Sequence, residues 1–253
     1  MPAVAFNLTA YVVAVIFVAT LIRSTLGFGE ALVAVPLLAL RTPVEVAAPL
    51  AVLVSIVVAG VVVVQDRRGI EFRAAAGLIL ASLVGIPLGV LLLVRVDDQV
   101  VKLLLGSVII AFSLYSLTMG RGRSLSHDHV GWLIVCGFFA GVLGGAYGMN
   151  GPPLAIYGAL RKWSPQHFRA TLQAYFLPVS VVGLAGYSLI GLWTAAVTWY
   201  FFWSLPAVII ATFAGRAINQ RMKGEGFVRV VYGGLLLTGA VLFLQAVAAI
   251  GLL

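Results

Sequence analysis

The feature that most constrains this chain is a series of apolar segments, each about 20 residues long, that recurs along its whole length. A helix of that length spans the hydrocarbon core of a lipid bilayer. Hydrophobic residues make up 62% of the 253 residues, and charged residues make up only 9%. A soluble domain needs a largely polar exterior, which this composition cannot supply. The sequence therefore predicts an all-α polytopic membrane protein.

Glycine-rich stretches interrupt two of the apolar segments. Residues 8–40 are broken at Gly27-Phe28-Gly29, and residues 131–160 are broken at the stretch GGAYGMNGPP. Glycine adopts backbone conformations that other residues resist, and proline is favoured in the first turn of a helix. We therefore expect one helix to end and another to begin at each break. Uninterrupted helices are predicted over 44–64, 72–95, 99–119, 166–190, 193–215 and 227–252.

The second half of the chain repeats the order of breaks and charges found in the first half. Gly27-Phe28-Gly29 corresponds to Gly148-Met149-Asn150, and Leu40-Arg41 corresponds to Leu160-Arg161. Any two membrane helices resemble one another to some degree, but breaks in matching places favour an internal repeat. Each repeat is expected to hold a broken or re-entrant helical hairpin followed by three transmembrane helices. The predicted parts are a first repeat at 1–119, a linker at 120–130 and a second repeat at 131–253.

Loop charge gives the orientation. Most of the 16 Lys and Arg residues lie near 65–73, 120–130, 161–169 and 216–229, and the alternating loops carry few. The positive-inside rule makes the basic loops cytoplasmic, so both termini face outward and the two repeats are inverted relative to each other. The sequence leaves open whether each hairpin spans the membrane fully or re-enters. The basic loops account for the net charge of +8, so no nucleic-acid partner is expected.

The two breaks predict where a substrate binds. Inverted repeats with broken helices are typical of secondary transporters, and the breaks mark the site near the membrane midplane. A helix N-terminus presents unpaired N–H groups and a partial positive charge, so two such ends meeting there would bind an anion. The alternative is that the glycines only allow close helix packing, as we expect of Gly60 and Gly106. A break in a helix inside lipid leaves backbone N–H and C=O groups unpaired, which is costly. This cost favours a functional role for the two clusters.

The stretches GFGEALVAVPLLALRTPVEVAAPL and GGAYGMNGPPLAIYGALRKWSPQHFRAT resemble the paired signatures of the TauE/SafE family of sulfite exporter-like membrane proteins. The resemblance covers nearly the whole chain. It implies a multi-pass carrier of a bacterial or archaeal inner membrane. It also implies small sulfur-containing anions as substrates, such as sulfite, sulfoacetate and related organosulfonates. The resemblance does not fix the particular anion.

Glu30 is the acid that must lie well inside the membrane, because the other acids fall in loops or near helix ends. A charge at that depth costs at least about 2.5 kcal/mol unless it is paired or hydrated. One hypothesis makes Glu30 a proton carrier that repels the anion when charged and admits it when protonated. The other hypothesis makes it the ion-pair partner of Arg23, across the Gly27–Gly29 break. The two hypotheses are compatible.

Other polar residues complete the candidate site. Arg23 could bind an oxyanion directly, the Asn150 amide could donate to a sulfonate or cap a helix, and Gln173 could face the substrate or join two helices. His127 and His129 in the linker are interpreted as solvated, and no catalytic residue, metal site or cofactor is predicted. The candidate substrate-binding residues are Arg23, Gly27, Phe28, Gly29, Glu30, Tyr147, Gly148, Asn150, Gly151, Pro152, Thr171 and Gln173, with Glu30 also the candidate for proton coupling.

These inferences favour a secondary transporter that exports a small anion by alternating access. Its expected partners are the anion and the lipid bilayer, and the sequence leaves a homo-oligomer open. The main alternative is a proton- or sodium-linked cation carrier or channel that uses Glu30 and the carbonyl oxygen of Gly27. An intramembrane lipid-phosphate enzyme is disfavoured, because the breaks gather neither several acids nor a nucleophile with an evident base.

Overall fold

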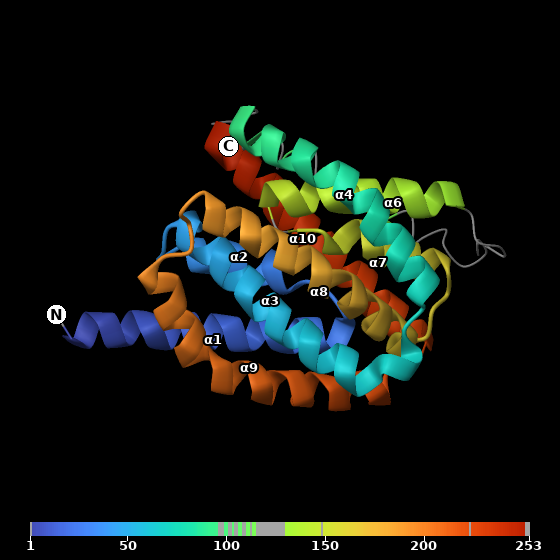
Figure 1. The fold of residues 1–253 in the computed structure, drawn as a ribbon, viewed down its shortest axis with the longest axis horizontal. Helices are drawn as coiled ribbons and strands as arrows, with labels where there is room; N and C mark the ends of the chain where they lie inside the picture. The colour runs from blue at the N-terminus through green and yellow to red at the C-terminus, as the bar shows by residue number, and fades with distance from the viewer. Residues whose placement is uncertain are drawn as a thin grey trace. The chain divides into compact units, whose positions relative to one another are not determined.

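The computed structural model describes residues 2–95, 99–100, 103, 106–107, 110–111, 113–114, 130–147, 149–222 and 224–250. The regular elements of these residues are all helical, with no strand among them (Figure 1). The predicted all-α fold class is therefore confirmed. The predicted helix at 99–119 is described only in part, and residues 120–129 of the predicted linker lie outside the described residues.

Helices form where the apolar segments predict them. Two short helices, α2 and α7, follow the two glycine-rich breaks, and a 3-10 turn, η1, follows α3. The bounds are α1 (Pro2–Leu26), α2 (Glu30–Ala39), α3 (Val44–Asp66), η1 (Arg67–Gly69), α4 (Phe72–Arg95), α6 (Val130–Tyr147), α7 (Gly151–Leu160), α8 (Pro165–Leu189), α9 (Ala195–Arg221) and α10 (Gly224–Ile250).

The described part of the chain contains 6 helices that are long and apolar enough to cross a membrane. Each carries few charges over at least 18 residues, the length that a bilayer core requires. The protein is therefore a multi-pass membrane protein. The candidate spans are Asn7–Leu26, Glu45–Gly69, Phe72–Gly89, Pro165–Leu189, Ala195–Arg221 and Tyr232–Ala249.

Both predicted breaks are present. The first lies between the end of α1 at Leu26 and the start of α2 at Glu30, and the second lies between α6 and α7. The helices that follow the breaks, α2 and α7, have 10 residues each. A helix of that length rises about 15 Å, which is half of the hydrocarbon core. Neither short helix can cross the membrane by itself.

Local sequence explains where α8 and α9 begin. The Ser164 hydroxyl accepts a hydrogen bond from the backbone N–H of His167 at 3.3 Å, and Pro165 occupies the first helical position. Thr194 caps α9 in the same way, through the N–H of Val197 at 3.4 Å. The predicted end of α9 at 215 is too early, because the helix continues to Arg221.

The chain divides into two compact units, and each contains segments from both halves of the sequence. Unit 1 comprises Met1–Leu80 and Ser164–Met222, and unit 2 comprises Ala81–Trp163 and Lys223–Leu253. The first break therefore belongs to unit 1 and the second to unit 2. The inverted repeat and its predicted domain boundaries stay a prediction.

The core of unit 1 is built by α1, α2, α3, α8 and α9. Helix α1 packs along α9, helix α3 packs on α8 and α9, and α2 packs on both α1 and α3 (Figure 1). The shared core is formed by fully or almost fully buried aliphatic side chains. Among them are Val12, Ile16, Ala34, Leu38, Val54, Val58, Val197 and Val208.

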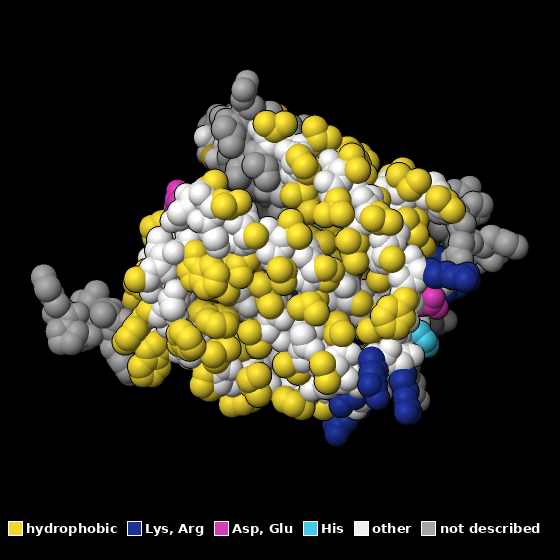
Figure 2. Space-filling model, viewed as in Figure 1, with side chains coloured by type: hydrophobic (Ala, Val, Ile, Leu, Met, Phe, Trp, Pro, Cys, Tyr) yellow, Lys and Arg dark blue, Asp and Glu magenta, His cyan; other side chains and the backbone are white. Residues whose placement is uncertain are grey.

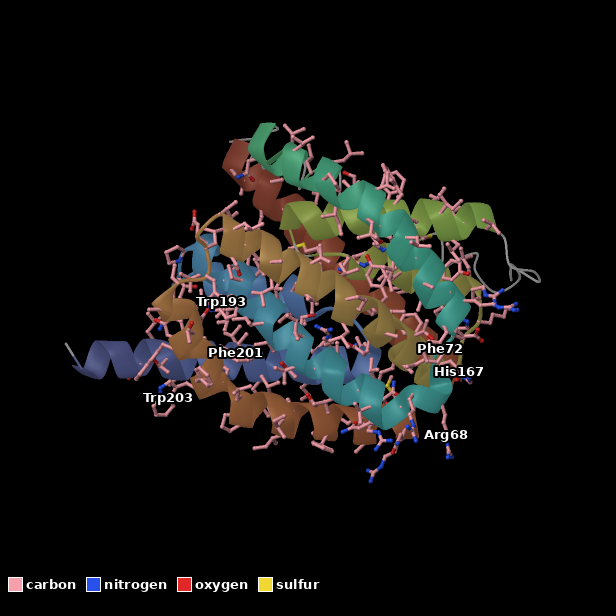
Figure 3. All side chains as sticks on the ribbon, in the orientation of Figure 1. Arg68, Phe72, His167, Trp193, Phe201 and Trp203 are labelled. Carbon is pink, nitrogen blue, oxygen red and sulfur yellow. The ribbon has the colours of Figure 1, made fainter. Side chains whose placement is uncertain are left out.

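The two ends of unit 1 differ in chemistry. Arg68, Phe72 and His167 lie at one end, and Trp193, Phe201 and Trp203 lie toward the other (Figure 3). Hydrophobic side chains dominate the visible surface, and Lys and Arg side chains gather where α3 and α9 finish (Figure 2). Exposed side chains such as Leu80, Trp199 and Phe202 suit contact with lipid. We call the end with Arg68 the basic end of unit 1.

Unit 2 shows close packing of small residues. The second half of α4 lies so near α6 that a Cβ atom on Gly85 would stand 2.8 Å from the backbone nitrogen of Val142. The Ser82 hydroxyl donates to the carbonyl oxygen of Gly137 at 2.7 Å, which joins the same two helices. Gly106 lies against the backbone of Gly239, as its predicted packing role requires. The same prediction for Gly60 is wrong, because a Cβ atom there would meet nothing within 4 Å.

Candidate substrate-binding site

The first break owes its shape to two glycines. Gly27 and Gly29 have φ angles of 90° and 101°, in the left-handed region that side chains with a Cβ atom rarely adopt. Gly27 also packs tightly against α8, since a Cβ atom on it would stand 3.1 Å from the Cα atom of Arg169. The backbone can therefore turn sharply after α1 and start α2 at Glu30.

Arg23, in the last turns of α1, is the centre of a buried polar cluster. Its side chain is only 4% exposed, and its Nη1 atom donates to the Glu30 carboxylate. Its Nε and Nη2 atoms both donate to the Oε1 atom of Gln173, at 3.1 Å and 2.7 Å. Nη2 also approaches the carbonyl oxygen of Ser55 at 3.4 Å. We call Arg23, Glu30 and Gln173 the Arg23 cluster.

The guanidinium group is also held from one face. It lies over the ring of Phe176, with the Cζ atom of Arg23 4.8 Å from the ring centroid. An aromatic face attracts a cation, and more strongly where water is excluded. The orientation of Arg23 is thus fixed by an acid, an amide and a ring.

Glu30 is paired, as one of the two hypotheses predicts. Its side chain is 3% exposed, and it accepts from Thr20 Oγ1 at 3.3 Å as well as from Arg23. Glu30 is also the first residue of α2, where the helix dipole favours a negative charge. The ion pair with Arg23 is confirmed, and the proton-coupling role of Glu30 stays a prediction.

Gln173 connects α8 to the break. While its Oε1 atom accepts from Arg23, its Nε2 atom donates to the carbonyl oxygen of Gly27 at 2.9 Å. Residues 169, 173, 176 and 180 follow one another at intervals of three or four, which places them on one face of α8. Ser180 on this face shares a hydrogen bond with Ser55 of α3, with 2.8 Å between the two hydroxyl oxygens.

A second charged cluster lies one helical turn from Gln173, toward the basic end. Asp66, the last residue of α3, accepts from Arg169 through Oδ2. Its Oδ1 atom accepts from Arg216 Nε at 3.0 Å and Nη2 at 2.8 Å. Arg169 Nε also donates to the carbonyl oxygen of Ser24 at 2.7 Å. We call Asp66, Arg169 and Arg216 the Asp66 cluster.

Sequence reasoning missed the Asp66 cluster. It counted Arg169, near the start of a predicted helix, and Arg216 among the basic residues of the cytoplasmic side, whereas both lie inside helices and Arg169 is only 1% exposed. The pairs are 103 and 150 residues apart in sequence, so no local pattern joins them. The available signal was the spacing of Arg169 and Gln173, which puts two polar side chains on one face of an apolar helix.

Two other predicted residues of unit 1 have structural contacts of their own. Thr171 accepts a hydrogen bond from the backbone N–H of Glu71 at 3.0 Å, which ties α8 to the start of α4. Phe28 packs edge-on against Phe168, with 6.2 Å between ring centroids. The structure therefore brings together Arg23, Glu30 and Gln173, with Gln173 also bonded to the Gly27 carbonyl oxygen, and it directs the Thr171 hydroxyl elsewhere.

The remaining predicted residues belong to the second break, in unit 2. Gly151 and Pro152 form the buried start of α7, and Asn150 directly precedes that helix. Pro152 and Pro153 have no backbone N–H, so this helix start offers fewer donors to an anion than the start of α2 does. The side chain of Tyr147 and residue Gly148 lie outside the described residues. A meeting of the two breaks stays a prediction.

The Arg23 cluster lies between the basic end of unit 1 and the middle of α8. Gln173 stands about 12 Å along a helix about 37 Å long, counted from Pro165. Gly27 packs even closer to that end, against Phe168 and Arg169. The first break therefore lies on the side of the middle of α8 that is toward the basic end.

Comparison with known proteins agrees with this architecture. Apolar spans and two glycine-broken segments define a multi-pass helical membrane protein. The model of the family described as "Sulfite exporter TauE/SafE" matches residues 12–242, and the chain belongs to this family of membrane transporters rather than enzymes. The chain is 29% identical over 210 residues to "Probable sulfite/organosulfonate exporter TauE" of Cupriavidus necator, with 82% of each chain covered. No solved structure matches the chain.

Proposed function

We propose that this protein is a secondary transporter that exports a small sulfur-containing anion, such as sulfite or an organosulfonate, through a site at the Arg23 cluster. The observation that carries the proposal is a buried arginine held beside a glycine-rich helix break, in a chain of the TauE/SafE family. The name of the relative from Cupriavidus necator supports the class of substrate. The ligand of this site would be the transported anion.

The chemistry of the Arg23 cluster suits an oxyanion. A guanidinium group is planar and offers several donors in a fork that fits the oxygens of a carboxylate, and sulfite and sulfonate groups present oxygens in a similar way. At rest, the Glu30 carboxylate occupies one side of the Arg23 fork. An anion that takes this position would gain the same charge-assisted hydrogen bonds, and the uncapped N–H groups at the start of α2 lie beside it.

Glu30 would then link transport to protons. Two negative groups cannot share one guanidinium without repulsion, so the anion enters when Glu30 takes up a proton and leaves when Glu30 loses it. This exchange gives the carboxyl group the two roles that the sequence suggested, as ion-pair partner and as proton carrier. The anion and the proton would move in the same direction, so export would draw on the anion gradient or the membrane potential, and an inward proton gradient would oppose it.

Alternating access would expose the site to one side of the membrane and then to the other. The basic end of unit 1 would face the cytoplasm by the positive-inside rule, with both termini outside. The protein would lie in the inner membrane of a bacterial or archaeal cell, as the family resemblance implies. Export would start from the basic end.

The geometry argues against the cation alternative. A sodium site would need the Glu30 carboxylate and the Gly27 carbonyl oxygen as ligands. The carboxylate is already neutralised by Arg23, and the Gly27 carbonyl already accepts from Gln173 at 2.9 Å. A cation there would also meet the buried positive charge of Arg23.

Flux measurements on purified protein in proteoliposomes test the proposal. Sulfite and methanesulfonate should cross the vesicle membrane faster than in protein-free vesicles. Their flux should not require sodium. Acetate serves as the carboxylate control. Sodium-dependent uptake with no anion requirement would support the cation carrier and overturn the proposal.

A further inference from the structure

The Asp66 cluster carries more positive than negative charge at a partly buried place. Two guanidinium groups share one carboxylate, which leaves a net charge of one positive unit on the three side chains. Exposure falls inward, from 33% at Arg216 and 20% at Asp66 to 1% at Arg169. The cluster therefore leads from the basic surface of unit 1 into its interior.

Buried polar atoms beside the cluster lack partners. Arg169 Nη2, Ser24 Oγ and Thr25 Oγ1 are buried without a hydrogen-bond partner among the described residues. Ser24 adjoins the cluster directly, because its carbonyl oxygen accepts from Arg169 Nε at 2.7 Å. Unpaired buried polar atoms are rare in proteins, and the free Nη2 atom of Arg169, inside the cluster itself, indicates a place where a ligand binds.

The Asp66 cluster also adjoins the Arg23 cluster. Arg169 and Gln173 are one turn apart on the same face of α8, and Ser24 follows Arg23 in α1. Asn219 of α9 donates to the carbonyl oxygen of Thr25 at 2.8 Å, which fixes the end of α1 between the two clusters. An anion at Arg169 would have Arg23 as its next positive partner.

We propose that the Asp66 cluster is a second oxyanion-binding site, in which the substrate displaces the Asp66 carboxylate from Arg169 and Arg216. The inference rests on the proposed function, because the ligand is the same anion on its way to Arg23. Asp66 fills the position of an anion while the site is empty of substrate. Sulfite or a sulfonate group presents oxygens to both guanidinium groups, and the free Nη2 donor of Arg169 can complete its shell.

The displaced carboxylate sets the affinity of this site. Substrate must compete with Asp66, so removal of the Asp66 charge should strengthen binding, and removal of the Arg216 charge should weaken it. If Asp66 and Arg216 only held helices together, both variants would lower stability. Their effects on sulfite affinity would then not have opposite signs. Arg216 is part-exposed, so Arg216→Gln leaves the buried Arg169–Asp66 pair intact.

The test is a calorimetric titration of sulfite into the purified full-length protein. It is carried out for wild type, Asp66→Asn, Arg216→Gln and Arg68→Gln. Arg68 is an exposed arginine at the same end and serves as the charge-matched control (Figure 3). We expect about tenfold tighter binding in Asp66→Asn, about tenfold weaker binding in Arg216→Gln and no change in Arg68→Gln. The KM for sulfite flux should move in the same directions.

The outcomes separate this inference from the proposed function. Equal sulfite affinity in wild type, Asp66→Asn and Arg216→Gln overturns the second site, even if the wild type transports sulfite. Opposite shifts in affinity without sulfite flux support the site and overturn the exporter. If Asp66→Asn does not fold, Arg216→Gln decides alone: an affinity equal to that of Arg68→Gln overturns the inference.

Discussion

Arg23 and Glu30 face each other across the Gly27–Gly29 break and form a buried ion pair, each no more than 4% exposed. The pair closes the turn between a helix of membrane-spanning length and a helix of 10 residues. Gln173 completes the arrangement from α8, because it bonds both to Arg23 and to the carbonyl oxygen of Gly27. A charge pair inside an apolar bundle thus lies beside a break in the helical backbone.

Neutralising one partner of the pair should cost more stability than neutralising both. Arg23→Gln leaves the Glu30 carboxylate buried without its cation, and loss of one partner of a buried pair costs about 3–5 kcal/mol. The double variant Arg23→Gln with Glu30→Gln removes both charges and should be less destabilised than Arg23→Gln. Thermal unfolding in detergent measures the order. A double variant that unfolds below both single variants would show that the charges do not act as a pair.

Glu30→Gln should abolish proton coupling and retain anion exchange. The amide keeps the shape of the side chain but cannot carry a proton on and off. Methanesulfonate is the suitable substrate, because it is a strong acid whose own charge does not change over the measured pH range. In the wild type, its flux should rise as pH falls and should acidify the vesicle interior as it enters. If acidification persists in Glu30→Gln, another group carries the proton.

Gly27→Ala should destabilise the protein and impair transport. Its φ of 90° disfavours any residue with a Cβ atom, and the added atom would stand 3.1 Å from the Cα atom of Arg169. Backbone strain of this kind costs about 1–3 kcal/mol. Gly60→Ala is the matched control, because its Cβ atom meets nothing within 4 Å and alanine favours the helix. Equal unfolding temperatures for the two variants would contradict the role assigned to the break.

Gln173→Leu should raise the KM for sulfite about tenfold, because Arg23 loses the acceptor of two of its donors and with it a fixed orientation. Thr171→Val on the same helix is the control. The Thr171 hydroxyl bonds to the backbone of Glu71, so this variant should lose about 1 kcal/mol of stability and keep its KM. An equal rise in KM for the two variants would place the effect in α8 as a whole rather than in the Arg23 cluster.

Much of the helical layout could be predicted, because its signals are local. Apolar length predicted the long helices, and glycine with proline predicted both breaks to within a residue or two. The ion pair of Glu30 and Arg23 could be predicted, since the two residues flank one break. Gln173 could be named as a candidate site residue, because it is a polar residue in an apolar helix. Its two partners could not be predicted.

Contacts between distant segments could not be predicted from local patterns. Asp66 and Arg216 are 150 residues apart, and each looked like an ordinary loop charge. Thr171 and Gln173 are both polar residues of the apolar helix α8, but their side chains contact different neighbours. Gly60 and Gly106 looked alike as packing glycines, yet only Gly106 has a neighbouring backbone against it. Tertiary packing decides each of these cases.

The most direct test of the account is sulfite flux in proteoliposomes for the wild type and for the Arg23→Gln, Glu30→Gln double variant. The double variant removes the proposed binding charge without leaving an unpaired one, so it separates binding from folding. We predict sulfite flux in the wild type and, in a folded double variant, flux no greater than in protein-free vesicles. Sulfite flux at the wild-type rate in the double variant would show that the anion does not bind at Arg23 and would contradict the central claim.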